Sequence, residues 1–195
     1  MENIYKEKLR SFLNYAVPIS DEEWNLFDQR LVITKFHKGD LILMAGDTEK
    51  YIYFLLEGVS RIFYLKDDTE YTLRFNFPIS VFNSYTSYIS QSPSLVSVEA
   101  LTDIVCFKMS YTKMQSLYEE SKIAERIGRK MIEMLYVQRE LKEIQIHTKT
   151  AEDFYREMLE KNRDLIQHIP QKYIASYLGI TPESLSRIRK KIAEN

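Results

Sequence analysis

The sequence predicts an α+β protein in which a β jelly roll is followed by a long helix and a small all-α helix-turn-helix domain. Three observations support this. Apolar residues alternate in strand-like fashion before residue 109, a helical period without proline follows, and a helix, a glycine turn and a second helix lie near the end. The 195 residues, 45% of them hydrophobic, suffice for one ordinary domain and a small one. We expect the jelly-roll domain at residues 1–109, the long helix at 110–147 and the helix-turn-helix domain at 148–195.

The first 30 residues or so have a helical pattern that is interrupted at Pro18. We expect two helices that pack against the jelly roll within the first domain. Their apolar anchors are Leu9, Phe12, Leu13, Trp24, Leu26 and Phe27.

Strand-like alternation begins at about residue 31. Residues 59–65 and 71–77 each alternate in side-chain character, and the polar segment 66–70 separates them. Short strands that are joined by polar turns are typical of a barrel or a jelly roll.

From about residue 110 to 147 the apolar period becomes helical. A stripe at 4-3-4-3 spacing resembles the seam of a coiled coil with one polar position, so we expect a dimerisation helix. The alternative is a long helix packed on its own domain. The predicted interface residues are Ile127, Met131, Met134, Gln138 and Leu141.

The segment 171–192 predicts a helix-turn-helix unit. Ile174 and Leu178 share one helix face, and Gly179 follows where a left-handed cap is needed. Thr181 can cap the second helix, and Pro182 suits its first position. The inward stripe of the second helix is Leu185, Ile188 and Ile192.

The outward face of this second helix predicts sequence-specific binding to double-stranded DNA. Residues 171–195 carry five Lys or Arg and two Glu, a net charge of +3, whereas the whole chain carries −1. Base-reading candidates are Glu183, Ser186 and Arg187. Phosphate-binding candidates are Lys172, Thr181, Arg189, Lys190 and Lys191.

A β-barrel, a long helix and a terminal helix-turn-helix, in that order, resemble the Crp/Fnr superfamily of bacterial transcription regulators. The residues that carry the resemblance are 36–40, 45–47, 53–59 and 174–188. It implies a sensory jelly roll of the cyclic-nucleotide-binding type, a homodimer on a pseudo-palindromic operator, and RNA polymerase as a further partner.

The resemblance also implies where a cyclic nucleotide would bind. Nucleotide-binding members have a Gly-Glu pair for the ribose and an Arg-Ser or Arg-Thr pair for the phosphate. Here the matching positions are Asn83-Ser84 and Ser94-Leu95, a degenerate cassette without a cation. We therefore expect no cofactor and no response to cyclic AMP or GMP in the usual manner. Arg74 is the nearby cation that could substitute.

The sequence offers no catalytic or metal-binding motif, so we expect a protein that is not an enzyme. His37, His147 and His168 lack the spacing of metal ligands, and Cys106, the single cysteine, has the setting of a buried strand residue. No apolar run reaches the ~20 residues of a membrane span, so we expect a cytoplasmic protein without a membrane partner. The alternative function is a jelly-roll module that binds a small molecule or a protein and no DNA.

Overall fold

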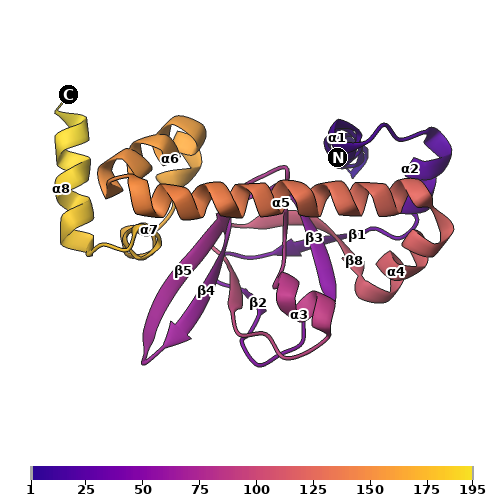
Figure 1. Ribbon diagram of the computed structural model, residues 1–195, viewed down its shortest axis with the longest axis horizontal. Helices are drawn as coiled ribbons and strands as arrows, with labels where there is room; N and C mark the ends of the chain where they lie inside the picture. The colour runs from indigo at the N-terminus through magenta and orange to yellow at the C-terminus, as the bar shows by residue number, and fades with distance from the viewer. Residues whose placement is uncertain (1, 195) are drawn as a thin grey trace.

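A computed structural model describes residues 2–194 of the chain, and it confirms the predicted fold class (Figure 1). Met1 and Asn195, which belong to the predicted outer domains, lie outside the described residues. Eight strands form the jelly roll: β1 (Val32–Phe36), β2 (Leu41–Leu43), β3 (Tyr51–Glu57), β4 (Ser60–Lys66), β5 (Thr69–Asn76), β6 (Ser80–Phe82), β7 (Ser97–Ala100) and β8 (Ile104–Ser110).

Two four-stranded antiparallel sheets face each other, in the orders β1-β8-β3-β6 and β2-β7-β4-β5. Aromatic side chains fill the space between them, and the Tyr53 and Phe82 rings stack with centroids 4.9 Å apart. Gly58 turns the chain from β3 into β4 with φ of +88°, and a Cβ atom there would lie 2.2 Å from the carbonyl oxygen of Asp103. The interior of the roll is therefore a packed core.

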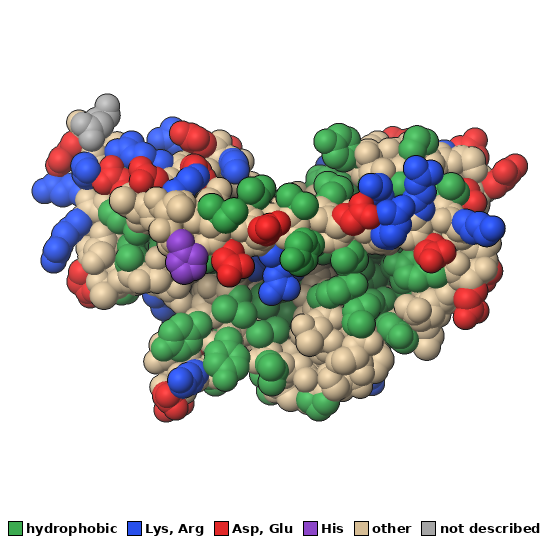
Figure 2. Space-filling view, viewed as in Figure 1, with side chains coloured by type: hydrophobic (Ala, Val, Ile, Leu, Met, Phe, Trp, Pro, Cys, Tyr) green, Lys and Arg blue, Asp and Glu red, His purple; other side chains and the backbone are tan. Residues whose placement is uncertain are grey.

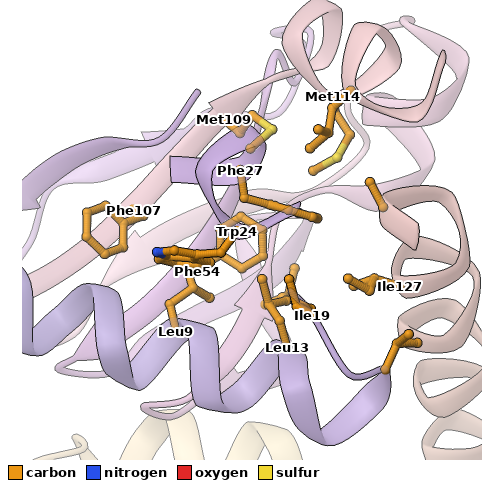
Figure 3. Close-up of a cluster of buried hydrophobic side chains, with 14 of the residues drawn as sticks. Leu9, Leu13, Ile19, Trp24, Phe27, Phe54, Phe107, Met109, Met114 and Ile127 are labelled. Atoms are coloured by element: carbon orange, nitrogen blue, oxygen red, sulfur yellow. The ribbon is translucent and has the colours of Figure 1, made fainter. Parts of the chain in front are cut away.

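The predicted N-terminal helices are present as α1 (Glu2–Ala16) and α2 (Asp21–Asp28). Together with α4 (Tyr111–Glu120) they cover the sheet that contains β3 and β8. Figure 3 shows Leu9 and Leu13 of α1 pointing toward Trp24 and Phe27 of α2 and toward Ile127. This second core holds the start of the long helix against the jelly roll.

The stretch that we expected to be one long helix from residue 110 is two helices. Ser121 has extended backbone angles, φ −136° and ψ 112°, and its hydroxyl oxygen accepts a hydrogen bond from Ala124 N at 3.0 Å. Because this hydroxyl caps a new helix, α4 ends at Glu120 and the long helix α5 spans Lys122–Thr148. A short helix, α3 (Tyr85–Ser90), connects β6 to β7.

The C-terminal domain consists of α6 (Ala151–Ile166), α7 (Gln171–Leu178) and α8 (Pro182–Ala193). The local signals of the turn are confirmed: Gly179 is left-handed with φ of 68°, and the Thr181 side chain accepts from Ser184 N. Buried residues of these helices share a core with the jelly roll, namely Ile174, Ala175 and Leu185 with Val59, Phe75 and Leu101. The helix-turn-helix is thus docked on the sheet.

Candidate functional site

Helix α8 stands at one end of the molecule, away from the strands (Figure 1). Its inward stripe is anchored by the fully buried Leu185. Each predicted base-reading residue, Glu183, Ser186 and Arg187, is exposed on the opposite face. Hydrogen bonds from its own backbone N–H and from Thr181, and the nearby Arg187 charge, keep the pKa of Glu183 below its usual value. This face therefore carries a carboxylate, a hydroxyl and a guanidinium.

The phosphate-binding candidates flank that face, where Figure 2 shows basic side chains gathered. Lys172, Arg189 and Lys190 are exposed. The Lys191 ammonium pairs with Glu152 of α6 at 2.7 Å, so it already has an anionic partner. The Thr181 hydroxyl is engaged in the helix cap, with Ser184 N 3.2 Å away.

The helix-turn-helix contacts the jelly roll through polar groups that the sequence analysis missed. The Ser176 hydroxyl on α7 donates to Glu70 O at 2.8 Å and accepts from Thr72 N at 2.9 Å. Arg61 of β4, 1% exposed, lies 3.5 Å from the centre of the Tyr173 ring of α7. Arg61 lies within the predicted strand 59–65, but no local pattern links it to a residue more than a hundred positions away.

Arg61 is also paired within its own sheet. Its guanidinium forms ion pairs of 2.6 Å with Glu70 and with Glu99. A buried arginine with two carboxylates is a fixed element of the structure. The Tyr173 ring therefore packs against a guanidinium that is held in place.

One predicted interface residue is wrong. Ile127 is 1% exposed and lies in the core with α1 and α2, so it is not available to a partner chain. Met131 is half-buried against the same core, whereas Met134, Gln138 and Leu141 are exposed.

A stripe of α5 that keeps Met134 and Leu141 of the predicted seam is apolar and open. Met134, Val137, Leu141 and Ile144 are 39%, 51%, 54% and 53% exposed. Their spacing of 3, 4 and 3 residues places them on one face of the helix, beside the face that packs on the jelly roll. The apolar seam is thus shifted around the helix from the predicted one.

The degenerate cassette is brought together by the fold. Asn83, Ser84 and Ser94 are buried, and the Ser94 hydroxyl donates to the Ser84 hydroxyl at 2.7 Å. Leu95 is 76% exposed and does not take part.

Glu49 lies at the centre of this cluster and was missed by the sequence analysis. It is 1% exposed, and its carboxylate accepts from the backbone N–H groups of Tyr51 at 3.0 Å and Ser84 at 3.4 Å. Burial raises the pKa of Glu49 to about 7. The Glu49 carboxylate therefore already accepts a hydrogen bond from the Ser84 N–H of the cassette.

Arg74 lines the hollow beneath α5 together with the cassette residue Asn83, and it also lines a second pocket. Its side chain lies near Arg139 and Lys142 of α5 and near Tyr177 of α7. Burial, followed by the Arg139 charge, lowers the pKa of Arg74.

A hollow of about 640 Å³ lies beneath α5, and Figure 2 shows apolar side chains on both sides of it. Phe54, Tyr88 and Met131 are among its lining residues. This hollow separates the middle of α5 from the outer face of the jelly roll.

Burial raises the pKa of the Cys106 thiol to about 12, which agrees with the predicted buried strand position. Within residues 2–194 no group of three or more His, Cys, Asp or Glu is arranged to hold a metal ion. None of the described helices combines the length and apolar character that crossing a bilayer requires.

The fold and the site together define a class: a cyclic-nucleotide-binding-type jelly roll joined by a long helix to a docked helix-turn-helix. Residues 33–121 match the family model of the cyclic nucleotide-binding domain. No curated protein sequence matches the chain.

Solved structures have the same architecture over most of the chain. FixK2 from Bradyrhizobium japonicum is 20% identical with a TM-score of 0.70, and 84% of this chain and 85% of that chain are covered. The c-di-GMP-responsive global regulator CLP from Xanthomonas campestris is 16% identical with a TM-score of 0.69 over 90% and 92%. A structure from Eubacterium rectale described as a Crp/Fnr transcriptional regulator is 18% identical, with a TM-score of 0.68 over 90% and 84%. The predicted fold is confirmed: this chain has the fold that these solved structures share.

Proposed function

We propose that the protein is a homodimeric transcription regulator that binds double-stranded DNA in a sequence-specific manner. The observation that carries this proposal is the exposed face of α8, on which Glu183, Ser186 and Arg187 project from a helix with a buried Leu185 anchor. A helix held in this way can enter a major groove without losing its own packing.

Each residue on this face has a chemical role. Arg187 suits the O6 and N7 acceptors of guanine, and Glu183 can accept from the N4 amino group of cytosine. Lys172, Arg189 and Lys190, with Lys191 and Thr181, would contact phosphates and set the register of the helix on the duplex.

The homodimer rests on the exposed stripe of α5. Pairing Met134, Val137, Leu141 and Ile144 with the same residues of a second chain would bury an apolar seam between parallel helices. Two copies of α8 would then meet a pseudo-palindromic operator about 34 Å apart. Such a protein acts at promoters, so RNA polymerase is the further partner that we propose.

The proposed regulator does not respond to cyclic nucleotides in the usual manner. Ser94 provides no positive charge for a phosphate, and the Glu49 carboxylate uses the Ser84 N–H. A phosphate placed there would face a carboxyl group instead of a guanidinium.

Selection of binding sites from a random DNA pool tests the proposal. The protein should enrich a two-fold symmetric sequence, and Arg187→Ala should weaken binding by roughly 1–3 kcal/mol and relax preference at one base pair of each half-site. The control is Arg126→Ala, which removes an exposed arginine of α5. No enrichment by the intact protein would favour the alternative, a jelly-roll module that does not bind DNA.

A further inference from the structure

A second cavity, of about 350 Å³, lies where the jelly roll, the long helix and the C-terminal helices meet. Its walls come from β5, α5, α6 and α7, which converge on one side of the molecule (Figure 1). Residues from all three parts of the chain therefore face one pocket that is partly open to solvent.

Positive charges dominate this cavity. Arg74 of β5 and Arg139 and Lys142 of α5 line it. None of these three forms an ion pair with a carboxylate of residues 2–194, and the carboxylate among the described lining residues, Glu157, pairs with Lys149. The cluster thus lacks an anion of its own.

The three cations are held close enough to oppose one another. Burial, followed by the Arg74 and Arg139 charges, lowers the pKa of Lys142 to about 8. Burial, followed by the Arg139 charge, lowers the pKa of Arg74. Like charges that are partly removed from water destabilise a fold unless an anion compensates them, so a bound anion would be stabilised here.

Hydrogen-bond donors remain available. The Lys142 ammonium has three N–H groups, and one of them donates to Leu73 O at 2.7 Å. The buried Nε of Arg74 has no hydrogen-bond partner among residues 2–194. A carboxylate or phosphate group could accept from both side chains after a small adjustment.

Aromatic rings form part of the wall, which also includes Leu135, Met158 and Lys161. Lys142 Nζ lies 4.0 Å from the centre of the Tyr177 ring, and Phe75 and Phe154 lie 5.2 and 5.9 Å from that ring between centroids. Such walls accept the apolar body of a ligand, and the volume lies within the range of small-molecule sites.

We propose that this cavity binds a small organic anion, with a carboxylate or phosphate group held by Arg74, Arg139 and Lys142 and an apolar or aromatic body against Tyr177. The site lies outside the jelly-roll interior and contains no cassette residue, and it shares Arg74 and Leu135 with the hollow beneath α5 that Asn83 lines. Because the ligand would touch β5, α5 and α7 together, its occupancy changes how firmly the helix-turn-helix is docked.

Titration calorimetry on the full chain tests the site, with phenyl phosphate, benzoate, inorganic phosphate and the neutral benzyl alcohol as probes. We expect saturable binding of phenyl phosphate or benzoate at one per chain, and the stronger of the two identifies the acid group. Arg139→Gln, at an exposed position, and Lys142→Met should each weaken binding by at least about tenfold. Arg126→Met, elsewhere on α5, should leave it unchanged.

The proposal would be overturned if benzyl alcohol bound as tightly as the anions, or if no anion gave saturable binding. It would also be overturned if both variants bound the anions as tightly as the intact protein does. Calorimetry needs no DNA, so it decides the site even if the proposed function fails. The coupling to the helix-turn-helix rests on the proposed function and is measured separately, as the operator affinity with and without phenyl phosphate. The intact protein should show a change that Arg139→Gln lacks, and an unchanged affinity would overturn the coupling.

Discussion

The guanidinium carbon of Arg61 lies 3.5 Å from the centre of the Tyr173 ring, so a buried cation of the jelly roll supports the first helix of the helix-turn-helix. Arg61 is fixed by Glu70 and Glu99, and Ser176 adds two hydrogen bonds beside it. The position of α7 on the jelly roll is therefore set by these contacts, and α8 packs in turn against α7.

Removing this ring should loosen the docking. Tyr173→Leu eliminates the cation–π contact, which contributes on the order of 0.5–2 kcal/mol, and should speed hydrogen exchange in α7. Tyr173→Phe keeps the ring and should exchange as the intact protein does. Equal exchange in the leucine and phenylalanine variants would show that Arg61 does not hold α7.

Phosphate contacts should appear in the salt dependence of DNA binding. Arg189→Ala and Lys190→Ala should each weaken binding to all sequences alike and reduce the slope of log K against log salt by about one. The control is Lys122→Ala, at an exposed position of α5. A slope that neither substitution changes would place both side chains in solvent.

The shifted seam predicts which residues hold two chains together. Val137→Glu combined with Leu141→Glu places like charges in the seam and should give monomers in analytical ultracentrifugation. Ile146→Glu changes a residue of the same helix that is 59% exposed and lies off the stripe, so it should leave the dimer intact. An intact dimer in the double variant would move the interface to another surface.

Glu49 should make stability fall as the pH rises. Its pKa is about 7 in the folded chain and near 4.5 when exposed, so between these values the unfolded chain releases a proton that the folded chain retains. The free energy of unfolding should therefore decrease by up to about 3 kcal/mol from pH 4.5 to 7 and then level off.

Urea denaturation across this range measures the effect. Glu49→Gln has no titrating group and should lack this decrease, whereas Glu119→Gln, at an exposed position, should retain it. The same pH profile in the intact protein and in Glu49→Gln would mean that the Glu49 carboxyl is not strained by burial.

Cyclic AMP and cyclic GMP should not bind tightly, because Ser94 provides no cation and Glu49 occupies the Ser84 N–H. Calorimetry with both nucleotides should show no saturable heat, and DNA affinity should not depend on either. Micromolar binding together with stimulated DNA affinity would assign the phosphate to another residue.

The helix-turn-helix could be predicted from the sequence because its signals are local. Gly179, Thr181 and Pro182 act on the backbone within a few residues, so their spacing alone determines the turn. The alternation of the β4–β5 hairpin is equally local, which is why the jelly roll was predicted correctly.

The errors and omissions concern contacts between distant residues. The helical period shows that α5 has an apolar stripe, but it does not show which part of that stripe packs inside the same chain. In the fold, α1 and α2 cover Ile127, so this residue belongs to the core. Arg74 lies far in sequence from Arg139 and Lys142, and Glu49 lies far from Ser84. Only the closed fold places these groups together.

The ion pair between Lys191 and Glu152 has a consequence for the affinity of the proposed DNA complex. A DNA phosphate that approaches Lys191 competes with a carboxylate already 2.7 Å from the same ammonium. In the proposed complex this competition would oppose every duplex equally, so it would lower the affinity for operator and for random DNA alike and leave the free-energy difference between them unchanged. In that complex, a DNA phosphate would take the place that the Glu152 carboxylate of α6 holds beside Lys191.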